Sequence, residues 1–248
     1  MSFDTLALLE NVPDWGSSAP TAKLFEDWLH RGKKAVLGAT PESIDWETIQ
    51  VLELPPGLRS ASSLGCVLNP TWRKWVLGLY LADLVSYALP SDQVEFNRLS
   101  YLAAAFPEGF ALFWLQIARQ YWPVGYSGWY PMTSSAFETF EKRPESLQDR
   151  MVVPKTSASS TEANPIPASE RPFLYLFNYS VATPFKKSPL SKILMHRYAQ
   201  SLAAQNPQGL AAITVSDEGC RVASRFGMQQ TGHFKLGNEV ERVFTGRC

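Results

Sequence analysis

The chain has 248 residues, of which 45% are hydrophobic and 19% are charged. This composition is typical of a globular protein with a substantial core, and it excludes an intrinsically disordered chain. The 23 basic and 23 acidic residues balance, whereas a general nucleic-acid binder would carry an excess of Lys and Arg. We therefore expect a small-molecule or protein partner and no nucleic acid.

The first half of the chain predicts helices and strands in alternation. Residues 21–34 place apolar side chains at helical spacing, and residues 49–55 alternate like a strand that ends at Pro-Pro-Gly. Residues 69–89 predict a strong helix, and a second helix is expected from Ser91 or Asp92 to Ala105.

Two consecutive strands and a long loop follow in the middle of the chain. Residues 109–120 and 122–132 predict strands joined by a tight turn at Arg119-Gln120-Tyr121, and residues 135–141 predict a short helix. Residues 154–172 are rich in Ser, Thr, Pro and Ala, which is typical of a flexible loop.

The last third of the chain predicts a buried strand, a helix, a second buried strand, a short helix and a final pair of strands. These elements are expected at residues 172–182, 188–205, 210–216, 217–227 and on either side of 235–238. Gly227 suits the left-handed position that commonly ends a helix.

Cysteines and hydropathy favour a cytoplasmic protein without a membrane segment. Cys66, Cys220 and Cys248 are odd in number and lack metal-ligand spacing, so reduced thiols are expected and Cys220 is interpreted as a small buried thiol. The N-terminus lacks the features of a secretory signal. The most apolar helix candidate, residues 75–89, is interrupted by Asp83 and is shorter than the about 20 residues of a membrane span.

The stretch SVATPFKKSPLSKIL, residues 180–194, combines a strand end, a basic turn and a helix start. A helix N-terminus presents unpaired N–H groups and a partial positive charge, which attract a phosphate. Lys186 and Lys187 add positive charge beside it. Ser188 suits the N-cap position and Pro189 suits the first helical position. A capped corner with two solvated lysines is the alternative interpretation.

The order of these elements resembles the GCN5-related N-acetyltransferase (GNAT) superfamily. In the family pattern, a strand that ends in Val precedes Arg/Gln-x-x-Gly-x-Gly/Ala at a helix start. Here Val181 ends the strand, Phe185 stands at the usual aromatic position, and residues 186–191 form the loop. Residues 216–228 resemble the family's next helix element, with Gly227-Met228 in place of Gly-Phe. The resemblance spans about residues 108–246.

The resemblance implies an α/β fold with a mixed, mostly antiparallel central sheet flanked by helices. It implies an N-terminal helical extension at 1–45 and a GNAT-like acyltransferase domain at 46–248, with a flexible insertion at about 154–172. The partners that it implies are acetyl-CoA or another acyl-CoA and an amine acceptor on a small molecule or protein. The cofactor-binding residues would be Val181, Lys186, Lys187, Ser188, Pro189, Leu190, Ser191 and Ser216.

Two departures from the family pattern concern the loop and the catalytic acid. Pro189 and Ser191 replace the glycines that let a backbone approach a pyrophosphate closely, and Pro189 also removes an N–H donor. Many family members protonate the leaving thiolate with a tyrosine whose position here is Ala223.

We expect the catalytic groups on the strand that ends at Val181. Tyr179 is the best phenol near the expected thioester and Asn178 lies beside it; alternation would place Phe177 and Tyr179 on one face of the strand. Core packing is the alternative role for Tyr179 and for Tyr126 and Tyr130.

Two alternatives to a typical GNAT enzyme stay open. A catalytically inactive GNAT-fold module that binds a ligand or protein is consistent with the missing tyrosine and glycines. The stretch RQYWPVGYSGWYPMTSSAFETF also resembles the hairpin of toxin-activating lysine acyltransferases, which use acyl carrier protein. The three histidines, His30, His196 and His233, share no spacing that predicts a metal site or a catalytic triad.

Overall fold

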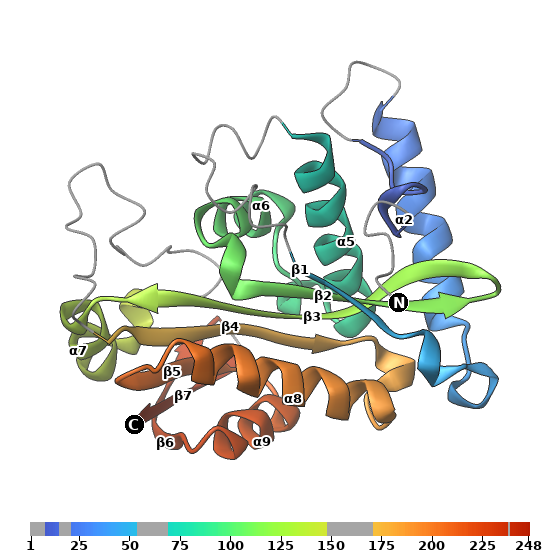
Figure 1. Ribbon diagram of the computed structural model, residues 1–248. Coiled ribbons are helices and arrows are strands. Elements are labelled where there is room, and N and C mark those ends of the chain that lie inside the picture. Colours follow the sequence, from blue (N-terminus) through green and yellow to red (C-terminus); the bar gives the residue numbers. More distant parts are fainter. Residues whose placement is uncertain (1–7, 15–20, 54–68, 148–170, 238) are drawn as a thin grey trace. The chain divides into compact units, whose positions relative to one another are not determined.

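The computed structural model describes residues 8–14, 21–53, 69–147, 171–237 and 239–248. Its helices are α2 (Thr21–Leu37), α5 (Pro70–Ser86), α6 (Phe96–Ala105), α7 (Ser134–Lys142), α8 (Pro189–Ala204) and α9 (Asp217–Arg225) (Figure 1). Its strands are β1 (Gln50–Glu53), β2 (Phe110–Ile117), β3 (Gln120–Met132), β4 (Phe173–Val181), β5 (Gly209–Thr214), β6 (Gln229–Leu236) and β7 (Glu239–Arg247).

The seven strands form one sheet in the order β1-β2-β3-β4-β5-β7-β6. β4 and β5 are parallel, whereas β1–β2, β5–β7 and β6–β7 are antiparallel. A helix, α8, connects the parallel pair, as a parallel crossover requires. The expected fold class is confirmed: a mixed, mostly antiparallel sheet flanked by helices.

The chain divides into two compact units. Unit 1 comprises residues 1–127 and 180–195, and unit 2 comprises residues 128–179 and 196–248. The long strands β3 and β4 each contribute residues to both units. Each unit is described by itself below.

The core of unit 1 is built around α5, most of whose side chains are buried. Asn69 caps this helix by accepting hydrogen bonds from Thr71 N and Trp72 N, and Pro70 stands at the first helical turn, as expected. Asp83 is 0% exposed although it lies on this apolar helix. Its carboxylate accepts hydrogen bonds from Tyr126 Oη and Val94 N, each at 2.8 Å, which compensate its burial.

The core of unit 2 lies between its part of the sheet and helices α8 and α9. Tyr198 and Leu202 of α8 pack with Ala223 of α9 and with strand side chains; the strand members of this cluster are Trp129, Leu174, Leu176, Leu210, Ala212 and Phe244. Tyr198 Oη donates a hydrogen bond to Gly128 O at 2.6 Å. The helical stripe expected in residues 188–205 comprises Leu190, Ile193, Leu194, Tyr198 and Leu202; all are buried except Ile193, which is half-buried.

Several predicted boundaries shift. The second helix begins at Phe96 rather than near Ser91, because Pro90–Asp92 form a 3-10 turn. The turn between β2 and β3 consists of Ala118 and Arg119, with φ of 50° and 67°, so Gln120 already belongs to β3. Two successive positive φ values match the twist of a tight hairpin turn.

Other predictions are confirmed or lie outside the described residues. Gly227 has φ of 78° and follows the end of α9, as predicted. Cys220 and Cys248 are free thiols, and Cys220 is half-buried rather than fully buried. Cys66 and residues 154–170 of the expected loop lie outside the described residues. Among the helices described, none is both long enough and apolar enough to cross a membrane.

Candidate functional site

The parallel strands β4 and β5 pair along only three residues. Their ladder joins Phe173 to Gly209, Leu174 to Leu210 and Tyr175 to Ala211. Both strands continue beyond this point, β4 to Val181 and β5 to Thr214. The facing backbone groups past Tyr175 and Ala211 are therefore not paired with each other. We call this part of unit 2, Leu176–Tyr179 and Ala212–Thr214, the β4–β5 opening.

Two faces of the unit 2 sheet can be told apart by the helices that cover them. Phe173 and Tyr175 contact Phe137 and Phe140 of α7, with ring centroids 4.1 and 5.9 Å apart, and this side is named the α7 face. Leu174 and Leu176 pack with residues of α8, and that side is named the α8 face. β4 alternates regularly over these residues.

The alternation breaks at Asn178. The Phe177 ring lies 6.3 Å from that of Tyr130, which also stacks on Tyr175 of the α7 face. Tyr179 instead stacks on Tyr198 of α8, with centroids 6.4 Å apart. The expectation that Phe177 and Tyr179 share a face is therefore wrong. A β-bulge breaks the alternation of side chains in this way. The break lies in the part of β4 that no longer pairs with β5.

Tyr179 is a half-buried phenol beside the opening. Burial raises its pKa from 10.0 to about 12, and the positive charge of Arg225 opposes part of this shift. The hydroxyl is therefore protonated at neutral pH. Tyr179 packs against the cluster that contains Ala223. Tyr179 and Ala223 thus belong to one packed region, although they come from different elements.

The end of β4 is anchored in unit 1. Ala182 N donates to Val124 O at 2.8 Å, and Phe185 N donates to Ala182 O at 2.8 Å. The Phe185 side chain is buried and its ring meets that of Trp46 edge-on, with centroids 5.7 Å apart. The aromatic residue of the loop thereby fixes the backbone that leads into α8.

The start of α8 is capped by its own loop. Ser188 Oγ accepts a hydrogen bond from Leu190 N at 3.2 Å and donates one to Phe185 O at 2.7 Å. Ser191 N donates to Ser188 O at 3.2 Å, and Ser191 Oγ donates to Lys186 O at 2.6 Å. The predicted N-cap is confirmed. Because Leu190 N and Ser191 N already have partners in the loop, this helix start offers a phosphate fewer donors than a glycine loop does.

The remaining predicted residues of the loop are placed as follows. Lys186 and Lys187 are exposed, Pro189 occupies the first position of α8, and Val181 and Leu190 are buried. All predicted loop residues belong to unit 1, whereas Asn178, Tyr179 and Ser216 belong to unit 2. The structure brings Asn178 and Tyr179 together at the break in β4.

Ser216 and Cys220 lie at the first turn of α9. Ser216 caps the helix, accepting a hydrogen bond from Gly219 N at 3.1 Å. Cys220 Sγ accepts a hydrogen bond from Arg242 Nη1 at 3.2 Å and lies 3.2 Å from Thr214 Oγ1. Arg242 Nη1 also donates to Asp217 Oδ1 at 2.9 Å. These bonds fix α9 to the ends of β5 and β7.

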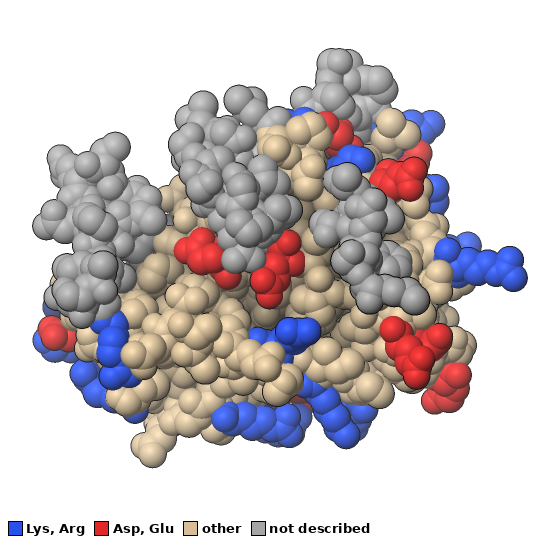
Figure 2. Space-filling view, viewed as in Figure 1, with Lys and Arg blue, Asp and Glu red and all other residues tan. Residues whose placement is uncertain are grey.

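Several exposed basic side chains lie on α8 and α9, the two helices that follow β4 in the chain. Figure 2 shows Lys and Arg side chains over the part of the surface where Figure 1 places α8 and α9. In unit 1 the exposed basic residues near the start of α8 are Lys186, Lys187 and Lys192. In unit 2, Arg197, Arg221 and Arg225 are exposed beside the exposed acidic Asp217 and Glu218, and Arg221 is paired with Glu218 at 2.8 Å.

One buried carboxylate of unit 2 was not singled out by the sequence analysis. Glu241 of β7 is 4% exposed. Alternation along β7 places it on the same face as the buried Val243, so the signal was present in the sequence.

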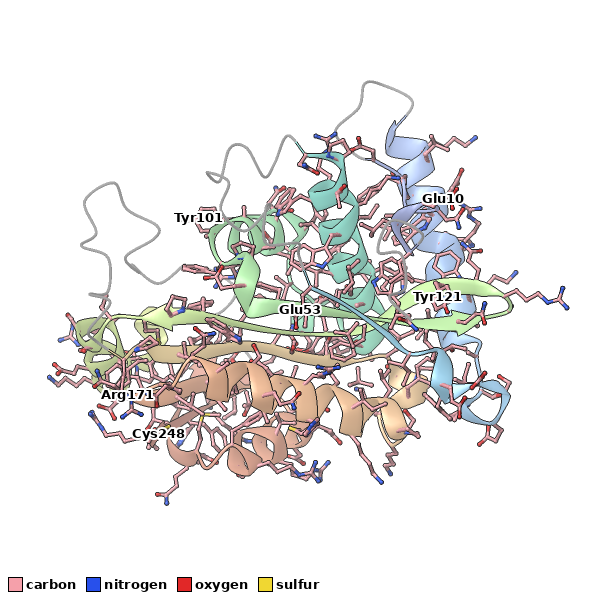
Figure 3. All side chains as sticks on the ribbon, viewed as in Figure 1. Glu10, Glu53, Tyr101, Tyr121, Arg171 and Cys248 are labelled. Carbon is pink, nitrogen blue, oxygen red and sulfur yellow. The ribbon has the colours of Figure 1, made fainter. Side chains whose placement is uncertain are left out.

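At the far end of this unit, Arg171 donates to Asn206 O at 2.8 Å and to Pro207 O at 2.6 Å, and Cys248 N donates to Gln208 O at 2.9 Å (Figure 3).

No protein-family model and no curated protein matches this chain. Among solved structures, a chain of the NatC complex bound to Gag peptide and CoA is 9% identical over 81% of this chain and 98% of that chain, with a TM-score of 0.48. Arabidopsis thaliana NAA60 in complex with acetyl-CoA is 10% identical over 81% of this chain and 100% of that chain, with a TM-score of 0.47. The corresponding values for Drosophila melanogaster polyamine N-acetyltransferase are 14%, 81%, 100% and 0.44. The similarity is one of fold.

Proposed function

On the premise of this GNAT-like fold, we propose that the chain is an acyl-CoA-dependent N-acyltransferase that acylates an amine of a small molecule or protein. The observation that carries the proposal is the early end of the β4–β5 ladder beside Tyr179. An extended ligand with amide groups can pair with the backbone of strands that have separated from each other. The pantetheine arm of acyl-CoA is such a ligand.

Residues at the end of β4 would hold the other parts of the substrate. Val181 and the backbone around it would position the pantetheine arm, and Lys186 and Lys187 would attract the pyrophosphate. Because the α8 start is capped by Ser188, lysine charge supplies a larger share of the affinity than backbone N–H groups do. Binding should therefore weaken as ionic strength rises.

Tyr179 would act as the hydrogen-bond donor to the departing sulfur. Its pKa of about 12 keeps the proton on the phenol at neutral pH. Asn178 lies where the alternation of β4 side chains between the two faces of the sheet breaks. Ser216 would act indirectly, since its hydroxyl already caps α9.

The second candidate is a GNAT-fold module that binds a ligand or protein without catalysis. Two observations favour it. Ala223 is buried at the position where the family carries its tyrosine, and Ser188 Oγ already accepts a hydrogen bond from Leu190 N at the start of α8. A module of this kind would bind CoA or another anion and release no thiol.

Thermal unfolding with and without acetyl-CoA or CoA tests binding. A ligand at about 100 times its dissociation constant stabilises the folded state by roughly 2.7 kcal/mol. Lys186→Glu should reduce this stabilisation, because it places a negative charge in the loop. Lys192→Glu, which changes an exposed lysine one turn into α8, is the matched control and should have a smaller effect.

Two results would contradict the binding site: no change of melting temperature with either CoA species, or equal effects of the two lysine variants. Release of free thiol in the presence of a panel of amines tests catalysis. CoA binding without thiol release from any acceptor would instead support the binding module.

A further inference from the structure

We propose that Ser180 is a positioning residue of the acyl-CoA site, because it holds the peptide unit that it shares with Val181 so that Val181 N–H points away from β3. This inference rests on the proposed function and deepens it by assigning the residue that orients the backbone at the end of β4. It is carried by the burial of Ser180, by the hydrogen bond of its hydroxyl to β3 and by the close approach of its carbonyl oxygen to Gly125.

Ser180 is a buried polar residue near the end of β4. It is 1% exposed. Its Oγ accepts a hydrogen bond from Tyr126 N of β3 at 3.3 Å, and both groups are buried. Burial of a hydroxyl is costly unless it is hydrogen-bonded. This bond therefore fixes the Ser180 side chain against the backbone of β3.

The residue that donates this bond is itself held in place. Tyr126 is 0% exposed and its ring stacks on that of Phe110, with centroids 6.4 Å apart. Its hydroxyl donates to Asp83 Oδ1 of α5 at 2.8 Å. Tyr126 is thus bonded to helix α5 through its side chain and to Ser180 through its backbone. Because both bonds lie within unit 1, the position of Ser180 is tied to the core of that unit.

The carbonyl oxygen of Ser180 also lies against β3. A Cβ on Gly125 would lie 2.6 Å from Ser180 O and 3.4 Å from Val181 Cα, so the absence of a side chain at Gly125 permits this close approach. Two residues further along β4, Ala182 N donates to Val124 O of β3 at 2.8 Å. The hydroxyl and the carbonyl oxygen of Ser180 are therefore both directed to β3.

The direction of this carbonyl group sets the direction of Val181 N–H. The two groups belong to one planar trans peptide unit, in which C=O and N–H point in opposite directions. Since Ser180 O points to β3, Val181 N–H points away from β3. In the order of strands, the other neighbour of β4 is β5, and the β4–β5 ladder has already ended at Tyr175. Val181 N–H is therefore directed to the edge along which β5 no longer pairs with β4.

This direction suits an extended ligand with amide groups. A carbonyl group of the pantetheine arm would accept a hydrogen bond from Val181 N–H, in the way that an added strand pairs with a sheet edge. CoA and acetyl-CoA carry the same pantetheine arm, so both would make this contact. Because the contact would be equal in the bound substrate and in the transition state, it should contribute to binding and not to the chemical step.

The test compares Ser180→Ala, Ser180→Thr, Ser86→Ala and the unchanged chain. Ser180→Ala removes the hydroxyl that accepts from Tyr126 N and allows the neighbouring peptide unit to rotate, whereas Ser180→Thr keeps a hydroxyl. Ser86 is the matched control, because it is also 1% exposed in unit 1 and its hydroxyl donates within α5, to Ala82 O at 2.6 Å. Calorimetry gives the affinities for CoA and acetyl-CoA, and thiol release with a saturating amine gives KM and kcat.

We expect Ser180→Ala to weaken the binding of both CoA species about tenfold, the effect of one hydrogen bond, and to raise the KM for acetyl-CoA by a similar factor. The kcat at saturating acetyl-CoA should stay within about threefold of that of the unchanged chain. Ser180→Thr should regain most of the lost affinity, and Ser86→Ala should bind both CoA species like the unchanged chain.

Amide hydrogen exchange followed by NMR tests the underlying hydrogen bond without any ligand. Ser180→Ala should accelerate exchange at Tyr126 N more than at the other amides of β3, since this N–H loses the hydroxyl as an acceptor. Ser86→Ala should not produce this local change.

The inference is overturned if Ser180→Ala binds both CoA species like the unchanged chain, or if Ser86→Ala weakens binding equally. It is also overturned if the loss falls on kcat alone, if exchange at Tyr126 N is not accelerated, or if Ser180→Thr melts like the unchanged chain and regains no affinity. Failure of the proposed function would look different: the unchanged chain would then bind neither CoA species, while Ser180→Ala would still accelerate exchange at Tyr126 N.

Discussion

The protonation of Tyr179 can be tested without any substrate. Burial raises the pKa of this phenol from 10.0 to about 12, whereas in the unfolded chain it should titrate near its ordinary value of about 10. Below pH 10 the phenol is protonated in both states. As the pH rises from 10 to 12, the unfolded state loses this proton and the folded state keeps it, so stability falls with rising pH.

The expected loss is about 3 kcal/mol, because the shift of about 2 pKa units corresponds to roughly 1.4 kcal/mol each. Tyr179→Phe removes the group and should remove this loss. Urea unfolding followed by circular dichroism from pH 9 to 12 gives the free energy of unfolding of both proteins. The chain has nine tyrosines, so the difference between the two curves is the quantity to compare.

Tyr101→Phe, which removes the hydroxyl of a tyrosine that is 43% exposed, is the control for the loss of a phenol in itself. Parallel curves for Tyr179→Phe and the unchanged chain between pH 10 and 12 would refute the assignment of a buried, protonated phenol. The same result would remove the physical basis for Tyr179 as a donor to the departing sulfur.

Two further predictions concern unit 1. Asp83→Asn should destabilise the chain by about 2 kcal/mol or more, because both carboxylate oxygens accept hydrogen bonds and an amide can replace only one acceptor; a change below 0.5 kcal/mol in urea unfolding would show that the network contributes little. Gly125→Ala should cost about 1–3 kcal/mol, because its Cβ would lie 2.6 Å from Ser180 O. Gly232→Ala, whose Cβ would meet its nearest atom at 4.0 Å, is the matched control, and equal losses for both would contradict the close approach of β3 to β4.

Local signals predicted α8 and α9 and their ends, but not the start of α6. The spacing of Leu190, Ile193, Leu194, Tyr198 and Leu202 predicted the stripe of α8, which is buried except at Ile193, because helical periodicity is set by nearby residues. Ser188-Pro189 and Gly227 predicted a helix start and a helix end for the same reason.

Long-range pairing could not be predicted from the same signals. The predicted faces of the β4 side chains assumed a regular ladder. This prediction failed at Asn178 because β5 separates from β4 after Tyr175, and no residue type within β4 indicates that separation. Asp83 stood out as a charge in an apolar helix, but its partner Tyr126 is 43 residues away. The hydrogen bonds that engage Ser191 with Lys186 O likewise depend on how the loop folds back.

The two departures from the family pattern act on separate parts of the proposed reaction. Replacement of the loop glycines, together with the cap by Ser188, reduces the donors offered to a pyrophosphate and so affects binding. In the proposed reaction, Ala223 at the position of the family's tyrosine would affect the departure of the thiolate and not the binding of acyl-CoA. Because Tyr179 packs against the cluster that contains Ala223, a phenol is retained in this region from a different element. Weak, salt-sensitive binding combined with thiol release that depends on Tyr179 would therefore distinguish an enzyme with a relocated donor from a module that only binds.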